Sequence, residues 1–167
     1  MKVKNLLSVL VVLTLASTVR AQTKISGEAE CGSVKMDQML IHEVGDHPNH
    51  RLALLQGTCS WSKPMQIAGM DAKEHVLTLS ADSRADKVES RAYAVGTMES
   101  GDRFFVQSQG ATTIQDGVPQ GEEGTWNFTG GTGKLEGLQG GGTYKAKKGP
   151  EGGPLYEFEG EYQLPAR

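Results

Sequence analysis

The sequence predicts an all-β protein: a single antiparallel β-barrel of eight or nine strands, with a β-sandwich as the alternative. Apolar residues alternate with polar ones at a period of two in many segments, and no segment after the N-terminus repeats them at helical spacing for three turns. Clusters of turn residues separate these segments at short intervals. Of the 22 glycines, 13 lie in residues 121–160, as a strongly curved sheet requires.

The first 21 residues are typical of a secretory signal peptide. Lys2 and Lys4 precede an uncharged apolar run, and Arg20 ends this run before it reaches the about 20 apolar residues that a membrane-spanning helix needs. Small residues at the minus-three and minus-one places predict cleavage after Ala21. We therefore expect a secreted or periplasmic protein whose mature chain, residues 22–167, is one β-barrel domain without a membrane span.

The net charge limits the classes of partner that the protein can bind, and the cysteines bear on the disulfide content of the mature chain. Residues 1–21 carry three basic and no acidic side chains, which leaves 14 basic and 20 acidic residues, a net charge of −6, in the mature chain. Such a surface repels phosphate backbones, so no nucleic-acid partner is expected. Cys31 and Cys59 are the only cysteines, and in an oxidising compartment they predict a disulfide, with two buried thiols as the alternative.

Seven predicted strands precede the last two. In each, β-branched, aliphatic or aromatic residues alternate with polar ones. Turn residues separate them: "VGDHPNH" at 44–50, the short hairpin loop "ESGD" at 99–102, and the turn "QDGVPQGE" at 115–122. The seven strands span residues 24–31, 37–44, 51–61, 74–81, 89–98, 103–114 and 123–129.

The last two strands, residues 143–147 and 155–164, predict their own register. The second places aromatic residues on one face and three glutamates on the other. If "KGPEGGP" turns the chain between antiparallel neighbours, odd positions face odd positions. Lys145 and Lys147 then stand among the glutamates, and the aromatic rows of the two strands coincide.

The glycine-rich block "GTWNFTGGTGKLEGLQGGGTY" at 124–144 is explained by curvature, since glycine permits tight corners and close approach between strands. We expect the chain to turn after Thr129, to form a single helical turn over residues 134–138, and to restart a strand at Gly140–Gly142. This block and "YEFEGEY" at 156–162 resemble the C-terminal part of the allene oxide cyclase barrel-like superfamily, which includes the plant dirigent proteins.

The resemblance looks closest to small secreted bacterial proteins of that shape whose role is unknown. It implies an eight-stranded antiparallel β-barrel, often assembled into dimers or trimers, with a cavity for a small hydrophobic molecule. The polar residues on which the activity of the plant proteins depends lie outside this block and have no match here, so no catalytic residue is carried over.

One segment gathers potential metal ligands, "HEVGDHPNH" at 42–50, which holds three of the four histidines with Glu43 and Asp46. The zinc-protease pattern fails, because Asp46 stands where a second histidine is required and the segment is a strand followed by a turn. We expect a polar loop there and no metal or other cofactor. No phosphate-binding loop and no G-x-S-x-G elbow occurs in the sequence.

These observations favour a secreted module that binds a small hydrophobic or aromatic molecule. Most of the aromatic residues are expected in the core. Trp61, Tyr93 and Phe105 are predicted to contact the ligand, and His50 is predicted to be a polar group near the rim of the barrel.

Two alternatives belong to other functional classes. An isomerase or cyclase would need a buried ionisable pair facing the cavity, for which His42, His50, Glu28 and Arg103 are nominal candidates. A structural envelope protein would associate through an extensive exposed aromatic patch. Because no motif identifies a catalytic residue, the sequence does not predict an enzyme.

Overall fold

The computed structural model describes residues 22–32, 39–150 and 152–166, so the predicted signal peptide lies outside the described residues. The described chain forms antiparallel β-strands and one 3₁₀ turn, η2 (Gly133–Leu135), and contains no α-helix. No helix in this part of the chain is long and apolar enough to span a membrane. The strands are β1 (Thr23–Cys31), β2 (Met39–Glu43), β3 (Arg51–Lys63), β4 (Gln66–Ile67), β5 (Met70–Ser83), β6 (Lys87–Met98), β7 (Arg103–Gln115), β8 (Val118–Gly131), β9 (Gln139–Lys148) and β10 (Pro154–Gln163).

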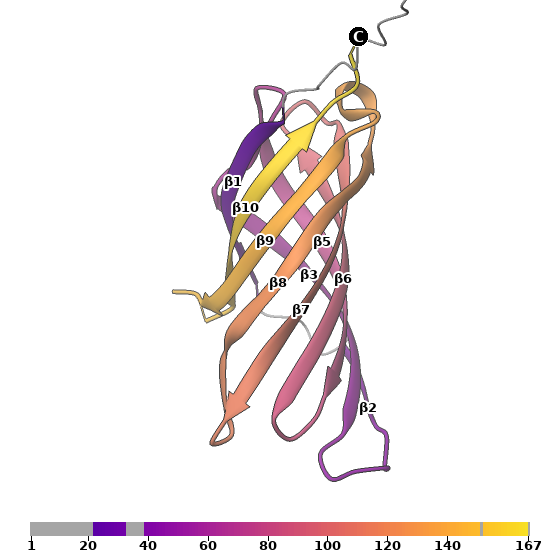
Figure 1. Ribbon diagram of the computed structural model, residues 1–167, viewed down its shortest axis with the longest axis vertical. Helices are drawn as coiled ribbons and strands as arrows, with labels where there is room; N and C mark the ends of the chain where they lie inside the picture. Colours follow the sequence, from indigo (N-terminus) through magenta and orange to yellow (C-terminus); the bar gives the residue numbers. More distant parts are fainter. Residues whose placement is uncertain (1–21, 33–38, 151, 167) are drawn as a thin grey trace, which may run out of the picture.

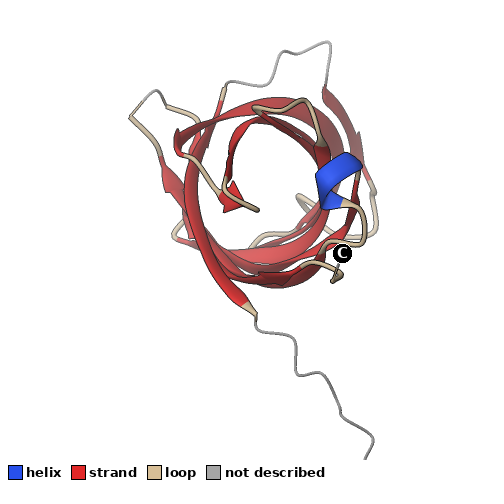
Figure 2. Cartoon of the chain, turned by 90° about the horizontal axis from the view of Figure 1, so that it is seen from above, coloured by secondary structure: helices blue, strands red, loops and turns tan. Residues whose placement is uncertain are grey.

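Eight of these strands close into a barrel, which confirms the predicted fold class over the sandwich. Pairing runs from β1 through β10, β9, β8, β7, β6 and β5 to β3, and β3 pairs with β1 again. Figure 2 shows the resulting ring of strands seen along the barrel. Because β3 and β1 pair, the ring is closed and none of its eight strands is an edge strand. β2 and β4 lie outside the ring, where β2 pairs with β3 and β4 pairs with β5.

The two ends of the barrel differ. At the end that carries β4 and η2, here called the closed end, apolar side chains fill the interior, and the backbone N–H of Ala68 donates to the Tyr162 hydroxyl. At the other end, here called the open end, the hairpins β2–β3, β5–β6 and β7–β8 extend beyond the β9–β10 turn (Figure 1). The buried side chains at the closed end include Met65, Ile67, Met98, Leu135 and Leu138.

Pairing explains why the open end is less complete. β8 pairs with β9 only over Glu122–Asn127, so its first residues pair with β7 alone. On the other side, β1 leaves β3 at the Cys31–Cys59 pair, and β2 continues along β3 from the Met39–Leu55 pair. Among the described residues no pairing joins β2 to β8, so backbone hydrogen bonds do not close the ring of strands at this end.

The predicted register between the last two strands is confirmed. Glu157 lies opposite Lys145, and Phe158 lies opposite Tyr144, so odd positions face odd positions. Lys147 and Glu157 form an ion pair on the outer face, while the aromatic side chains point into the barrel.

Several strands begin or end a few residues from the predicted bounds, and the helical turn expected over residues 134–138 is the 3₁₀ turn η2. Residues 37–38 of the predicted second strand lie outside the described residues. Two further differences have a physical reason. The segment 115–122 was expected to be a turn, but the turn is confined to Asp116–Gly117, both at positive φ, and β8 begins at Val118. Pro119 is tolerated in the strand because one edge of β8 is unpaired at this point. The short strand β4 was not predicted, because two residues carry no periodic signal.

The predicted disulfide between Cys31 and Cys59 is present, and it links β1 to β3 where the two cysteines lie directly opposite each other. Both residues are buried. A structural disulfide fits an extracytoplasmic location, and secretion itself stays a prediction.

Candidate ligand cavity

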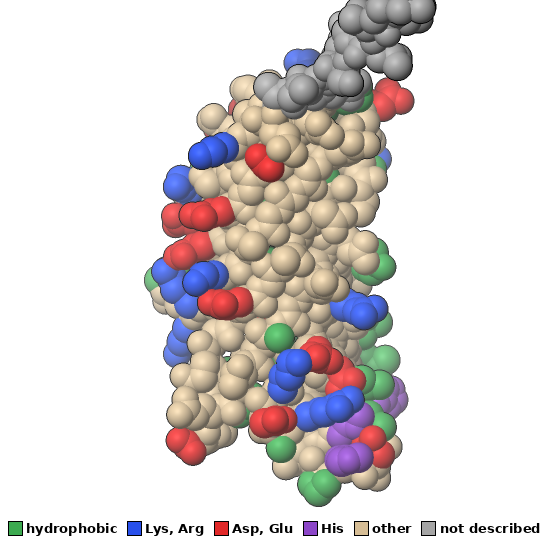
Figure 3. Space-filling model, in the orientation of Figure 1, with side chains coloured by type: hydrophobic (Ala, Val, Ile, Leu, Met, Phe, Trp, Pro, Cys, Tyr) green, Lys and Arg blue, Asp and Glu red, His purple; other side chains and the backbone are tan. Residues whose placement is uncertain are grey.

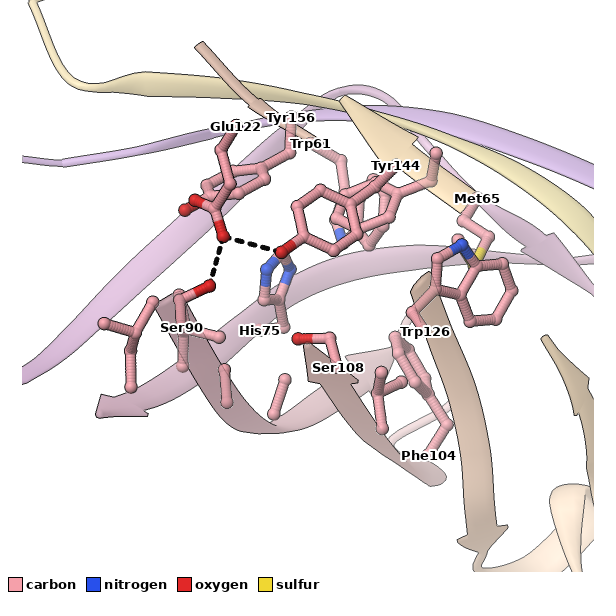
Figure 4. Close-up of a pocket in the computed structure, with 16 residues that line it drawn as sticks. Trp61, Met65, His75, Ser90, Phe104, Ser108, Glu122, Trp126, Tyr144 and Tyr156 are labelled. Atoms are coloured by element: carbon pink, nitrogen blue, oxygen red, sulfur yellow. Dashed lines mark hydrogen bonds between the residues drawn. The ribbon is translucent and has the colours of Figure 1, made fainter. Parts of the chain in front are cut away.

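A cavity of about 50 Å³ lies inside the barrel between the packed closed end and the open end. Its wall is formed by inward-pointing side chains of β3, β5, β6, β7, β8, β9 and β10, together with Met65 (Figure 4). The wall is mainly apolar, because alternation directs aromatic and aliphatic side chains of these strands inward. The lining residues used below are Trp61, His75, Ser90, Ala92, Glu122, Trp126, Tyr144, Tyr156 and Phe158.

Aromatic rings make up much of this wall. Phe158 lies at its centre, with ring centroids 5.7 Å from Trp61 and 6.0 Å from Tyr156. The rings of Trp126 and Tyr144 lie 6.4 and 6.1 Å from the same ring. Rings at these separations hold one another in place through edge-to-face, tilted and stacked contacts, so the wall is preorganised.

His75 is the buried imidazole of the cavity, with 5% of its surface exposed. It lies 5.2 Å from the Trp61 ring, and its Nδ1 has no hydrogen-bond partner in the protein. Burial lowers the pKa of His75 to about 4, because the apolar surroundings disfavour the charged form. The imidazole is therefore neutral at pH 7.

The indole Nε1 of Trp61 is likewise buried without a hydrogen-bond partner. This group can only donate. A buried donor without a hydrogen-bond partner destabilises the folded protein by about 1–3 kcal/mol. A ligand that places an acceptor next to this N–H would recover that free energy.

A carboxylate network occupies another part of the wall. Glu122 Oε1 accepts a hydrogen bond from the Tyr144 hydroxyl at 2.7 Å and another from the Ser90 hydroxyl (Figure 4). Burial and the Glu122 carboxylate raise the pKa of Tyr144, and burial raises the pKa of Tyr156. Both phenols therefore stay protonated at neutral pH. In the cavity wall, the carboxyl group of Glu122 is oriented by two donors, the hydroxyls of Tyr144 and Ser90.

The free energy of unfolding is expected to fall by about 3 kcal/mol as the pH is lowered from 6.5 to about 4. In this window the unfolded chain binds a proton at His75 and the folded protein does not, so acid favours unfolding. Trp61, Phe158 and the disulfide, which pack against this imidazole, do not titrate. Urea unfolding of the oxidised protein at several pH values measures the loss.

The matched variants for this prediction are His75→Phe and His47→Phe. The first should remove the pH dependence between 6.5 and 4.5, and the second should retain it, since the His47 side chain is 78% exposed. Equal stability of the unmodified protein at both pH values would contradict the prediction.

The structure separates the residues predicted to contact a ligand. Trp61 lines the cavity, whereas Tyr93 and Phe105 point to the outer face. Tyr93 is 62% exposed, and Phe105 is half-buried against Gly130. The outer face also exposes aliphatic side chains, and Tyr93 is the one aromatic residue among the exposed large hydrophobics of the described chain.

His50 is buried at the open end but outside the cavity lining. Its Nδ1 lies 2.5 Å from Asp46 Oδ1, and its Nε2 lies 3.0 Å from Asp82 Oδ1. The hydrogen bond from His50 lowers the pKa of Asp46. These contacts attach the β2–β3 turn to β5, beside β2 where histidines gather in Figure 3. His42 and His47, from the same sequence cluster, are exposed.

The other nominal catalytic candidates also lie outside the cavity lining. Glu28 is half-buried on β1, and Arg103 is exposed at the start of β7. The ionisable groups that do line the cavity are His75, Glu122 and the two tyrosines, none of which was singled out from the sequence.

Comparison with known proteins identifies no family for this chain. No protein-family model matches the chain, and no curated protein matches it. A similar solved structure is that of a protein of unknown function from the DUF3224 family of Shewanella oneidensis MR-1. It is 13% identical, the match covers 88% of this chain and 100% of that chain, and the TM-score is 0.48. No activity follows from this similarity, and the relationship to the allene oxide cyclase-like superfamily stays a prediction.

Proposed function

We propose that the protein binds one small aromatic molecule inside the barrel. The observation that carries this proposal is the pair of buried nitrogens without partners, Trp61 Nε1 and His75 Nδ1, in the wall of a mainly apolar cavity. Buried polar groups are normally hydrogen-bonded, and exceptions mark places where another molecule supplies the partner. The ligand would enter from the open end, because side chains fill the closed end.

The wall defines the chemistry of the ligand. A planar ring would pack against Phe158 and its neighbours, and a carbonyl oxygen on that ring would accept from the Trp61 N–H. A hydroxyl group elsewhere on the ring would donate to Glu122, whose carboxylate is already oriented by Tyr144 and Ser90. The free space of about 50 Å³ is smaller than the about 150 Å³ that takes up benzene, so a ligand of one ring would also have to displace side chains of the wall.

Calorimetric titration with 4-hydroxyacetophenone tests this proposal, because the probe carries one ring, one carbonyl and one hydroxyl. We expect one site, with a Kd of about 10–500 µM for a ligand of this size. Both tryptophans of the protein line the cavity, so the indole N–H resonance of Trp61 should shift on binding.

Two variants on neighbouring positions of β6 locate the site. Ala92→Leu extends a side chain into the cavity and should weaken binding at least tenfold, as expected for overpacking of the site. Tyr93→Ser changes the opposite face of the same strand and should leave the Kd unchanged. Unchanged affinity of folded Ala92→Leu, or no binding of the probe to the unmodified protein, would refute the proposal.

A second candidate function is proton transfer on such a ligand, and it is favoured by the carboxylate of Glu122 in the cavity wall. Cyclohex-3-en-1-one is a suitable probe: Glu122 would remove a proton from the carbon beside the carbonyl and return it to the far end of the double bond. The conjugated enone absorbs in the ultraviolet, which gives the rate.

We expect the unmodified protein to accelerate this isomerisation and Glu122→Gln to lower the rate at least a hundredfold, the usual effect of removing a general base. Equal rates with the protein, with the variant and with buffer alone would exclude this second function while leaving ligand binding to be judged by the titration.

A further inference from the structure

We propose that reduction of the disulfide creates a binding site for one Zn²⁺ ion, with Cys31, Cys59 and His75 as ligands. No metal role was expected for these residues. The inference concerns the reduced protein and does not require the proposed ligand, although both proposals use the unpartnered Nδ1 of His75. It applies to the reduced protein only, because the disulfide leaves no thiolate free to bind metal.

The barrel places the three residues in one row across three neighbouring strands. Cys31 on β1 lies opposite Cys59 on β3, and Cys59 lies opposite His75 on β5. Their side chains share the inner face, and their potential ligand atoms all lie within 4.8 Å of one another. Because the backbone pairing fixes this row, breaking the S–S bond leaves the three ligands on adjacent positions of the barrel wall.

Burial supplies the electrostatic reason for a divalent ion. All three residues are buried, with exposed fractions of 5%, 0% and 5% for Cys31, Cys59 and His75. Two thiolates in such surroundings need a compensating charge. One Zn²⁺ with two thiolates and a neutral imidazole has no net charge, and zinc prefers sulfur and nitrogen ligands of this kind.

His75 provides a second, independent observation. Its Nδ1 is buried and has no hydrogen-bond partner in the oxidised protein, so coordination through this nitrogen would break no hydrogen bond. His75 also lines the cavity, so the fourth position of a tetrahedral ion would face the cavity, where water or a ligand oxygen can complete the coordination.

The chemistry balances with a dithiol as the reductant. Two electrons and two protons from the dithiol convert the disulfide to two thiols, and the dithiol becomes a disulfide. Binding of Zn²⁺ then forms two Zn–S bonds and releases the two thiol protons.

The test starts from the protein reduced with a dithiol, which is then removed without oxygen. The reduced protein is titrated with Zn²⁺, and with Co²⁺ as a coloured substitute. We expect one equivalent to bind, two protons to be released, and the Co²⁺ form to show the visible bands of tetrahedral sulfur coordination. The oxidised protein is the matched control and should bind neither ion at this site.

His75→Phe, which keeps both thiols, should weaken Zn²⁺ binding to the reduced protein at least tenfold. Losing even a residue that only hydrogen-bonds to a metal ligand lowers metal affinity by about this factor. X-ray absorption of the Zn²⁺ form of the unmodified protein should show two sulfur ligands and one imidazole. If reduction unfolds the chain, Zn²⁺ should restore its near-ultraviolet circular dichroism. A reduced protein that binds no Zn²⁺, unchanged affinity in His75→Phe, or binding that leaves the chain unfolded would overturn the proposal.

Discussion

Replacing Gly142 with alanine is expected to lower the free energy of unfolding by about 4 kcal/mol, the range of the most damaging single substitutions. Gly142 on β9 lies directly opposite Gly160 on β10. A Cβ at position 142 would lie 1.9 Å from the backbone carbonyl oxygen of Glu159, and the adjacent strand cannot rotate away as a side chain can. The two strands would have to separate, which breaks their hydrogen bonds. Urea unfolding followed by tryptophan emission measures the change.

Gly32→Ala is the matched control, because a Cβ at position 32 would find its nearest neighbour, the Thr58 carbonyl oxygen, at 3.9 Å. We expect a change of at most about 0.5 kcal/mol for this variant. Similar stabilities for Gly142→Ala and Gly32→Ala would show that the close approach of β9 and β10 is not what requires glycine.

Removing the disulfide by the double substitution Cys31→Ala and Cys59→Ala is expected to cost about 3–4 kcal/mol of unfolding free energy. The two residues are 28 apart in sequence. Closing a loop of this length lowers the entropy of the unfolded chain, which destabilises the unfolded state by about 3–4 kcal/mol. Denaturant unfolding of the double variant and of the oxidised unmodified protein gives the difference.

Reductant distinguishes the covalent link from the packing of the two side chains. It should bring the unmodified protein close to the double variant and should leave the double variant unchanged. A double variant as stable as the oxidised protein would mean that the barrel, and not the link between β1 and β3, restricts this part of the chain.

Much of the fold was predictable because it depends on patterns within short segments. Alternation in residues 155–164 identified a strand and its inward face, and the opposite charges of Lys147 and Glu157 identified its neighbour. Such signals need only adjacent residues and a hairpin connection. The disulfide was predictable because only two cysteines are present.

The site was only partly predictable. Trp61 was expected at the cavity and lines it, but Tyr93 and Phe105 lie on the outer face. Glu122 was missed because the turn signals of Asp116, Gly117 and Pro119 hid the start of β8. In a strand that begins at Val118, every second residue counted back from Trp126 lies on the inner face. Glu122 would then have been identified as an inner residue.

His75 shows where inference from local sequence ends. Its neighbours in the chain predict a strand, but its role depends on β1 and β3, which bring the disulfide and the Trp61 ring to its side. Alternation and turn chemistry, which act between adjacent residues, were sufficient to specify an all-β chain and most of its strands. The inner row of Cys31, Cys59 and His75, and the cavity beside it, arise only when closure pairs β3 with both β1 and β5, because the contacts that create them join residues distant in the chain.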